Sequence, residues 1–304
     1  MQNQQSRIEG LWLPLITPFK DGRLDEDSWK NLLRHYGNLP VDGLILAATT
    51  GEGLTLDEDE TTRLVAIAAD VIAGGLPIYF GLSGSDTRKV AQAIERTESW
   101  SIDGYLITCP YYTRPAQDGL YRHFAVLAGQ TDRPIMVYNI PYRTGVNIEN
   151  ETLLRLADVA NIVAVKDCCV DPLQSFDLLR HRPAGFAVLT GEDAMFFGAL
   201  AQGADGGILA AAHVETQRFA EVRGALVADN HQDALRAWTE LFDVVRLLFA
   251  EPSPAPIKYW LWRLGLIHSP EVRLPMTGVS TALAARLDSA LSQCGHDGLV
   301  ALRD

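Results

Sequence analysis

Eight short apolar segments alternate with longer amphipathic ones over most of the chain. Between them, stretches such as residues 25–39, 57–72, 87–100 and 117–130 have helical periodicity and carry Asp, Thr or Ser at their starts, as helix N-caps do. Eight strand signals, each followed by a helix signal, predict an α/β fold, a closed parallel (β/α)8 TIM barrel. The expected strands are residues 10–17, 43–48, 77–82, 104–109, 134–139, 162–167, 186–191 and 206–211.

The main alternative is an open, doubly wound sheet. Such a sheet usually has a glycine-rich phosphate loop after its first strand, and residues 18–27 (PFKDGRLDED) contain none. The alternation stops near Asn230, and residues 231–250 are helical in period. A proline-rich breaker (EPSPAPIK, residues 251–258) and two more helix-like segments follow. We therefore expect a barrel domain over residues 1–229 and a C-terminal helical domain over residues 230–304.

Charge and composition exclude several classes of function. The formal net charge is −12, which disfavours nucleic acid, because phosphates require clustered Lys and Arg. No apolar run approaches the ~18–20 residues of a membrane span. Histidine and cysteine spacings match no metal motif, so we expect no metal and no cofactor. Without a secretion signal, the four cysteines are expected to be reduced thiols in the cytoplasm.

Lys166 is the unusual lysine. It follows the apolar, β-branched run 162–165, whereas the flanks of the other four lysines, Lys258 among them, suit solvent or loops. Burial penalises an ammonium and lowers its pKa. Lys166 either reaches solvent through its long stem or is an amine whose reactivity the fold adjusts.

Active sites of (β/α)8 barrels lie at the carboxyl ends of the strands. The second strand ends at Thr49-Thr50-Gly51-Glu52, a hydroxyl-rich turn that could seat a small carboxylate. The same residues could instead form a capping turn for the next helix, which the motif alone favours. Each other candidate also has a structural alternative. Tyr138 could be a packing residue and Arg143 a solvated loop residue, and the pair Tyr111-Tyr112 suits an interface as well as a pocket.

The residues that follow Lys166 have simple structural readings. Asp167 is expected to be a helix-start or salt-bridge carboxylate, and Cys168-Cys169 to be small apolar filling. Taken together, however, the strand ends supply a desolvated amine, a phenol, a hydroxyl-rich turn and a guanidinium. This set suits a Schiff-base reaction of a 2-oxo acid, in which a neutral amine attacks the ketone carbon and a phenol carries protons.

The motifs TTGEG, PYYTRPAQDGLYRHF, YNIPYRTG, VAVKD and GADGGI resemble, in order and spacing, the pyruvate-dependent class I aldolases of the dihydrodipicolinate synthase and N-acetylneuraminate lyase family. The resemblance implies a lyase in which Lys166 forms the Schiff base and Tyr138 relays protons. It also implies that Thr49 links Tyr138 to a second tyrosine, Tyr112, which a neighbouring subunit donates. The expected assembly is a homotetramer, a dimer of dimers.

The resemblance further implies four substrate-binding residues. Thr50 corresponds to the residue that binds the pyruvate carboxylate, Arg143 to the synthase arginine that receives the carboxylate of aspartate semialdehyde, and Ile208 and Gly191 to residues that line the pocket. The C-terminal segment and Arg143 favour the synthase branch, which condenses pyruvate with L-aspartate 4-semialdehyde in lysine biosynthesis. Asp167 favours the alternative, an aldolase that acts on a 2-oxo-3-deoxy sugar acid, 4-hydroxy-2-oxoglutarate or N-acetylneuraminate. A non-catalytic 2-oxo-acid sensor is a third possibility.

The chain departs from the family pattern at several positions. Ala48 replaces a glycine before the threonines, and Cys109 replaces a threonine before Pro110. Lys89 stands where lysine-inhibited synthases carry an acidic residue that holds the amine of the inhibitor. The other residues at the positions of that regulatory site are Gly53, Glu58, Thr61 and Ser85. The substitution by Lys89 predicts weak or absent inhibition by lysine.

Overall fold

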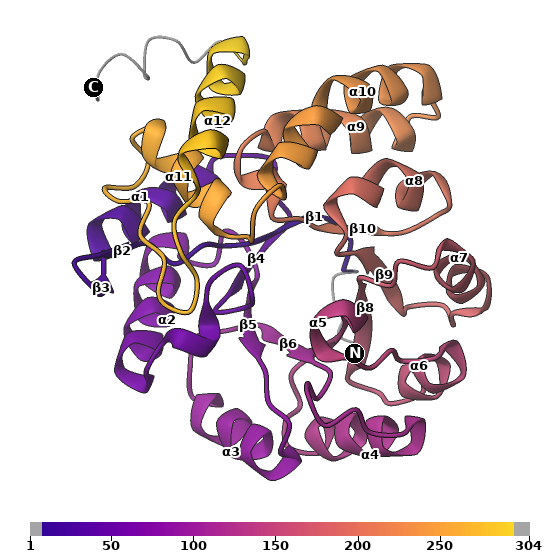
Figure 1. Ribbon diagram of the computed structural model, residues 1–304. Helices are drawn as coiled ribbons and strands as arrows, with labels where there is room; N and C mark the ends of the chain where they lie inside the picture. The colour runs from indigo at the N-terminus through magenta and orange to yellow at the C-terminus, as the bar shows by residue number, and fades with distance from the viewer. Residues whose placement is uncertain (1–7, 295–304) are drawn as a thin grey trace.

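The computed structural model describes residues 8–294. Eight parallel strands close into a barrel in the order β1-β10-β9-β8-β7-β6-β5-β4, and helices surround it (Figure 1). This arrangement confirms the predicted TIM barrel and excludes the open sheet. The barrel strands are β1 (Gly10–Pro14), β4 (Gly43–Leu46), β5 (Ile78–Leu82), β6 (Gly104–Thr108), β7 (Ile135–Asn139), β8 (Ile162–Asp167), β9 (Ala187–Thr190) and β10 (Gly206–Ile208).

The helices α1 (Glu26–Gly37) and α2 (Glu58–Ile72) begin where their capping residues predict. Asp25 accepts a hydrogen bond from the Ser28 N–H, and Asp57 and Glu60 form a capping box. The helices between strands are α1 (Glu26–Gly37), α2 (Glu58–Ile72), α3 (Thr87–Thr97), α4 (Gln117–Ala128), α5 (Pro141–Thr144), α6 (Asn150–Ala157), α7 (Pro172–His181), α8 (Phe196–Ala201) and α9 (Thr216–Val227). Short 3-10 turns are η1 (Gly53–Thr55), η2 (Asp193–Met195) and η3 (Ala211–His213), and β2 (Phe19–Lys20) pairs with β3 (Arg23–Leu24).

Closure of the barrel depends on glycine at the seam between β1 and β10. Gly10 pairs with Gly206, and a Cβ on Gly206 would stand 2.0 Å from the Gly10 carbonyl oxygen. Only glycine permits this approach of two backbones. Apolar side chains fill the barrel interior, including Trp12, Leu106 and Ile208, while a larger core lies between the strands and the helices.

Three further helices follow the barrel: α10 (His231–Leu248), α11 (Ala255–Arg263) and α12 (Thr281–Gln293). They lie together at one side of the ring of helices (Figure 1). The expected domain boundary falls between α9 and α10, and the division into two domains remains a prediction. No helix within residues 8–294 is long and apolar enough to cross a membrane.

The expected breaker over residues 251–258 is only partly correct, because α11 already begins at Ala255. Pro256 lies in the first turn of this helix, where a missing N–H breaks no helical hydrogen bond. Lys258, which the sequence places in a loop or in solvent, is therefore on a helix and is fully buried. That prediction was wrong.

Candidate active site

Lys166 and Tyr138 end two neighbouring strands at the carboxyl end of the barrel. They are register partners on β8 and β7, and the Lys166 Nζ lies 4.3 Å from the centre of the Tyr138 ring. The two side chains are 5% and 3% exposed. The stem of Lys166 therefore does not carry its ammonium out to solvent.

Burial determines the protonation of both groups. It lowers the pKa of the Lys166 ammonium, while Cys168, Asp193 and Glu192 oppose that fall. Burial also raises the pKa of the Tyr138 phenol well above its usual value. The site therefore favours a neutral amine beside a protonated phenol, which is the pairing needed for nucleophilic attack and for proton donation.

The Thr49 side chain lies near the Tyr138 phenol and acts to lower the pKa that burial raises. Thr50, the next residue, is buried. Their turn does not cap the following helix, because Asp57 is the N-cap of α2. The capping interpretation is therefore wrong for these two threonines, and the hydroxyl of Thr49 faces the site.

Gly191 fixes the space around the lysine. A Cβ at this position would stand 2.5 Å from Lys166 Cε and 2.4 Å from Cys168 Sγ. Both contacts are far shorter than van der Waals distance, so the lysine stem and the thiol lie directly on the backbone of Gly191. Ile208 is fully buried in the same interior cluster as Tyr138 and Cys168.

Sequence reasoning missed the role of Cys168 and the importance of two acidic residues. Cys168 is a buried thiol that interacts electrostatically with both Lys166 and Tyr138, so it contributes more than apolar filling. Asp193 is 5% exposed and accepts the Ala211 N–H at 2.6 Å, and burial raises its pKa to about 7. Glu192 accepts the Tyr142 hydroxyl at 2.7 Å. The signal for the two acids was the end of the seventh strand, TGED.

Asp167 does not face Lys166. Its carboxylate accepts the Ser175 hydroxyl at 2.6 Å, the Cys169 N–H at 3.0 Å and an Asn139 amide N–H at 3.4 Å. The N-cap of α7 is Asp171, so the helix-start interpretation of Asp167 is wrong. Successive side chains of a strand point to opposite faces, and Asp167 ties β8 to α7 on the outer face.

Three predicted residues are exposed: Thr49, Tyr112 and Arg143. Tyr112 is 91% exposed and has a backbone φ of 71°, and its N–H donates to the Thr144 carbonyl. Arg143 is exposed on α5, with its guanidinium carbon 5.9 Å from the Tyr142 ring centre. Arg143 still interacts electrostatically with both Lys166 and Tyr138.

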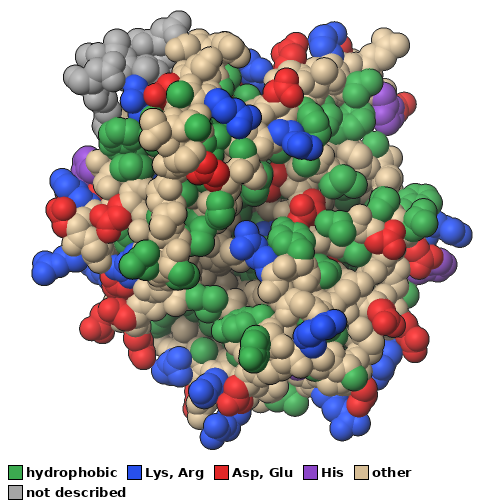
Figure 2. Space-filling model, in the orientation of Figure 1, with side chains coloured by type: hydrophobic (Ala, Val, Ile, Leu, Met, Phe, Trp, Pro, Cys, Tyr) green, Lys and Arg blue, Asp and Glu red, His purple; other side chains and the backbone are tan. Residues whose placement is uncertain are grey.

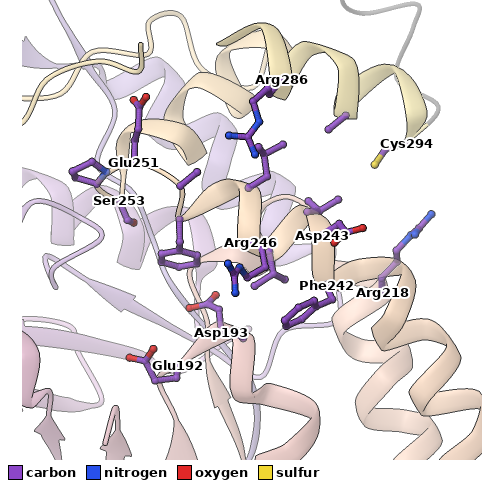
Figure 3. A pocket seen from close by; sticks show the side chains of 18 of the residues that line it. Glu192, Asp193, Arg218, Phe242, Asp243, Arg246, Glu251, Ser253, Arg286 and Cys294 are labelled. Atoms are coloured by element: carbon purple, nitrogen blue, oxygen red, sulfur yellow. The ribbon is translucent and has the colours of Figure 1, made fainter. Parts of the chain in front are cut away.

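A cavity of about 1320 Å³ opens above this end of the barrel. Gly191, Glu192, Asp193 and Arg143 line its barrel side, and α10 and α12 line the opposite side. In Figure 3, Arg246 and Arg286 reach into the space across from the two acids. Figure 2 shows acidic and basic side chains interspersed over this face of the molecule. The cavity therefore has local guanidinium groups among its carboxylates despite the negative net charge.

Known proteins are similar to this chain in sequence and in fold. The profile of the dihydrodipicolinate synthetase family matches residues 7–294. The 4-hydroxy-tetrahydrodipicolinate synthase 2 of Clostridium acetobutylicum is 44% identical over 285 residues, which are 94% of this chain and 100% of that protein.

Solved structures of dihydrodipicolinate synthases have the same fold as this chain. The dihydrodipicolinate synthase of Thermotoga maritima has a TM-score of 0.92 at 32% identity, over 95% of this chain and 99% of that one. The Acinetobacter baumannii enzyme, solved with pyruvate, has a TM-score of 0.91 at 31% identity, over 95% of this chain and 99% of that one. Fold and matches together define a lyase of the class I aldolase type. The chain belongs to the dihydrodipicolinate synthetase family, and these relatives confirm the predicted family and its synthase branch.

Proposed function

We propose that this chain condenses pyruvate with L-aspartate 4-semialdehyde to form 4-hydroxy-tetrahydrodipicolinate, with Lys166 as the Schiff-base residue. The observation that carries the proposal is the buried amine of Lys166 beside its register partner Tyr138. The synthases named above support the reaction, and the pyruvate bound to the Acinetobacter baumannii enzyme supports the first substrate.

The chemistry follows from a neutral amine. Lys166 Nζ attacks the ketone carbon of pyruvate, water leaves, and a protonated imine remains. Loss of a proton from the adjacent methyl group gives an enamine, whose carbon attacks the aldehyde carbon of the second substrate. The amino group of that substrate then replaces Lys166 at the imine carbon, which closes the ring and frees the lysine.

Tyr138 is the proton carrier of this sequence. Its raised pKa keeps the phenol protonated in the resting site, and the nearby Thr49 hydroxyl would orient it. A phenol in this position can protonate the leaving hydroxyl and accept the proton back. Tyr112 would complete the relay from a second copy of the chain, and its 91% exposure in one chain supports such a contact.

Two different groups would hold the two carboxylates. The Thr49–Thr50 turn binds the carboxylate of pyruvate, which places the ketone carbon at Lys166. Arg143, at the cavity side of the site, binds the carboxylate of the semialdehyde through its guanidinium fork. Arg143→Ala should therefore raise the KM for the semialdehyde by about tenfold to a hundredfold and leave the pyruvate adduct on Lys166 intact.

The sugar-acid alternative has lost its main support. Asp167 was the residue that favoured it, and the Asp167 carboxylate is bound to Ser175 and the Cys169 N–H, away from the cavity. The test is a substrate panel with pyruvate as the common partner. Turnover with aspartate semialdehyde and little with sugar-derived aldehydes supports the synthase, and the reverse preference contradicts it.

A further inference from the structure

Glu52 stands two residues after Thr50, and the turn that joins them is rigid. The Glu52 N–H donates to the Thr49 carbonyl at 3.1 Å, and the Gly53 N–H donates to the Ala48 carbonyl at 3.2 Å. Glu52 has a left-handed φ of 52°. A Cβ on Gly53 would stand 1.7 Å from the Ala47 carbonyl oxygen. Because the backbone packs on itself here, a displacement of Glu52 also displaces the two threonines.

The carboxylate of Glu52 is held from the C-terminal part of the chain. Lys258, on α11, donates from Nζ to Glu52 Oε1. The Arg273 N–H donates to Glu52 Oε2 at 2.9 Å. The side chains of Lys258 and Glu52 are 0% and 3% exposed, so this pair is cut off from solvent.

The ammonium of Lys258 is fully enclosed by partners. It also donates to the Glu271 carbonyl at 2.8 Å and lies 4.2 Å from the centre of the Phe19 ring. The Arg273 guanidinium carbon lies 4.1 Å from the same ring, and Arg273 also pairs with Glu60. The C-terminal segment therefore holds the connection between β4 and α2 at two points, at Glu52 in the loop and at Glu60 in the first turn of α2.

Stability alone does not account for a buried ion pair of this kind. Removing two charges from water costs about as much as their attraction returns, and apolar replacements are often as stable or more so. Burial also lowers the pKa of Lys258 to about 8. What the pair provides is a fixed position, because the contact from Lys258 ties the turn after β4 to α11, and the Arg273 N–H holds the second oxygen of the same carboxylate.

On the basis of the proposed function, we infer that Lys258 is a positioning residue: through Glu52 it fixes the Thr49–Thr50 turn that receives the pyruvate carboxylate. Lys258 acts on pyruvate binding from the C-terminal helices without touching the substrate. The C-terminal segment is thus coupled to the first half of the reaction.

The test compares three variants with the unmodified chain. Lys258→Met removes the ammonium and leaves the Glu52 carboxylate buried without its counter-charge, with the Arg273 N–H still bonded to it. The double variant, Lys258→Met with Glu52→Gln, also removes the buried charge of Glu52. It should restore much of the lost stability but not the contact between the turn and α11. Arg182→Met is the matched control, because Arg182 forms an ion pair with the buried Asp205, directly before β10 at the amino end of the barrel.

Three quantities are measured for each variant: the melting temperature, kcat/KM for pyruvate per active site, and hydrogen exchange at the amides of residues 51–53. Active sites are counted by pyruvate and borohydride. We expect Lys258→Met and the double variant to lose about ten- to a hundredfold in kcat/KM for pyruvate, and to exchange these amides faster. The double variant should melt closer to the unmodified chain. Arg182→Met should melt lower with kcat/KM unchanged.

Each outcome decides the question. If kcat/KM follows the melting temperature across the set, or if the double variant regains pyruvate activity, Lys258 serves stability only and the inference is wrong. Unchanged amide exchange in Lys258→Met would also overturn it. An unmodified chain that traps no pyruvate would instead contradict the proposed function, and the exchange data would still show whether Lys258 fixes the turn.

Discussion

Tyr138 and Lys166 are register partners on adjacent parallel strands, with the lysine nitrogen 4.3 Å from the centre of the tyrosine ring. Because the pairing of β7 with β8 sets this distance, the proximity of phenol and amine belongs to the barrel itself. Groups built on strands are held more precisely than groups on loops. The Thr49–Thr50 turn lies in a loop, and Lys258 on α11 ties that loop to the C-terminal segment through Glu52.

Tyr138→Phe should lower kcat by about 10²- to 10⁴-fold, since it removes a group that transfers protons and leaves the ring in place. The KM for pyruvate should change little. Steady-state kinetics checks this, with Tyr105→Phe as control, because the buried Tyr105 hydroxyl bonds Thr97 at 3.0 Å and takes no part in the proposed chemistry. A Tyr138→Phe enzyme with normal kcat would remove the phenol from the mechanism.

Gly191→Ala should slow the formation of the pyruvate adduct. The new methyl group would stand within 2.5 Å of both Lys166 and Cys168, and overpacking of this kind costs about 1–3 kcal/mol of stability. The lysine stem must move away from the carbon that it attacks. Gly198→Ala on α8 is the control, because no atom lies within 4 Å of its added Cβ. Equal adduct rates in the two variants would contradict this packing argument.

Asp193→Asn should stabilise the fold at pH 8 and much less at pH 4. Burial raises the pKa of Asp193 to about 7, so between pH 4 and 7 the folded chain binds more protons than the unfolded one. Stability is therefore lost as the pH rises through that range. Asparagine keeps an acceptor for the Ala211 N–H and removes the buried charge, which gives a gain on the order of 2 kcal/mol at pH 8. Denaturant unfolding at the two pH values measures it, and an equal gain at both would show that the carboxyl titrates normally.

Lysine should inhibit the reaction weakly or not at all. Lys89 is exposed at the position where lysine-inhibited synthases carry an acidic residue, and its ammonium repels the amine of the inhibitor. Two of the other positions are occupied within the chain: the Ser85 hydroxyl donates to the Tyr111 carbonyl, and the Thr61 hydroxyl donates to the Asp57 carbonyl. An inhibitor titration tests this, and a strong, cooperative loss of rate would contradict it. Lys89→Glu is the informative variant if inhibition is absent.

Much of this molecule could be predicted from local sequence pattern. The eight apolar segments predicted the barrel, because the hydrophobic pattern of a strand repeats with a different period from that of a helix. The short connections between the segments also favoured this fold. Lys166 was found because an ionisable residue at the end of an apolar strand is unusual. Arg143 and Tyr112 could be placed after the strands that precede them, although Arg143 proved to lie on the short helix α5. For an exposed side chain, the local sequence contains no signal that identifies its partner.

The burial of Lys258 could not be predicted in this way. Its segment contains three prolines and looks like a linker, yet those prolines lie before or within the first turn of α11. Its partner Glu52 is 206 positions away in the sequence, and such a contact has no periodic signature. Asp193 was missed for a related reason, since its raised pKa depends on burial beneath the cavity.

The most direct measurement is mass spectrometry of the chain after incubation with pyruvate and borohydride. We predict that one reduced pyruvate adduct forms per chain, that peptide mapping places it on Lys166, and that Lys166→Ala forms none and has no turnover. An adduct on Lys258 or on another lysine, or turnover that survives Lys166→Ala, would contradict the assignment of the buried lysine of β8 as the Schiff-base residue.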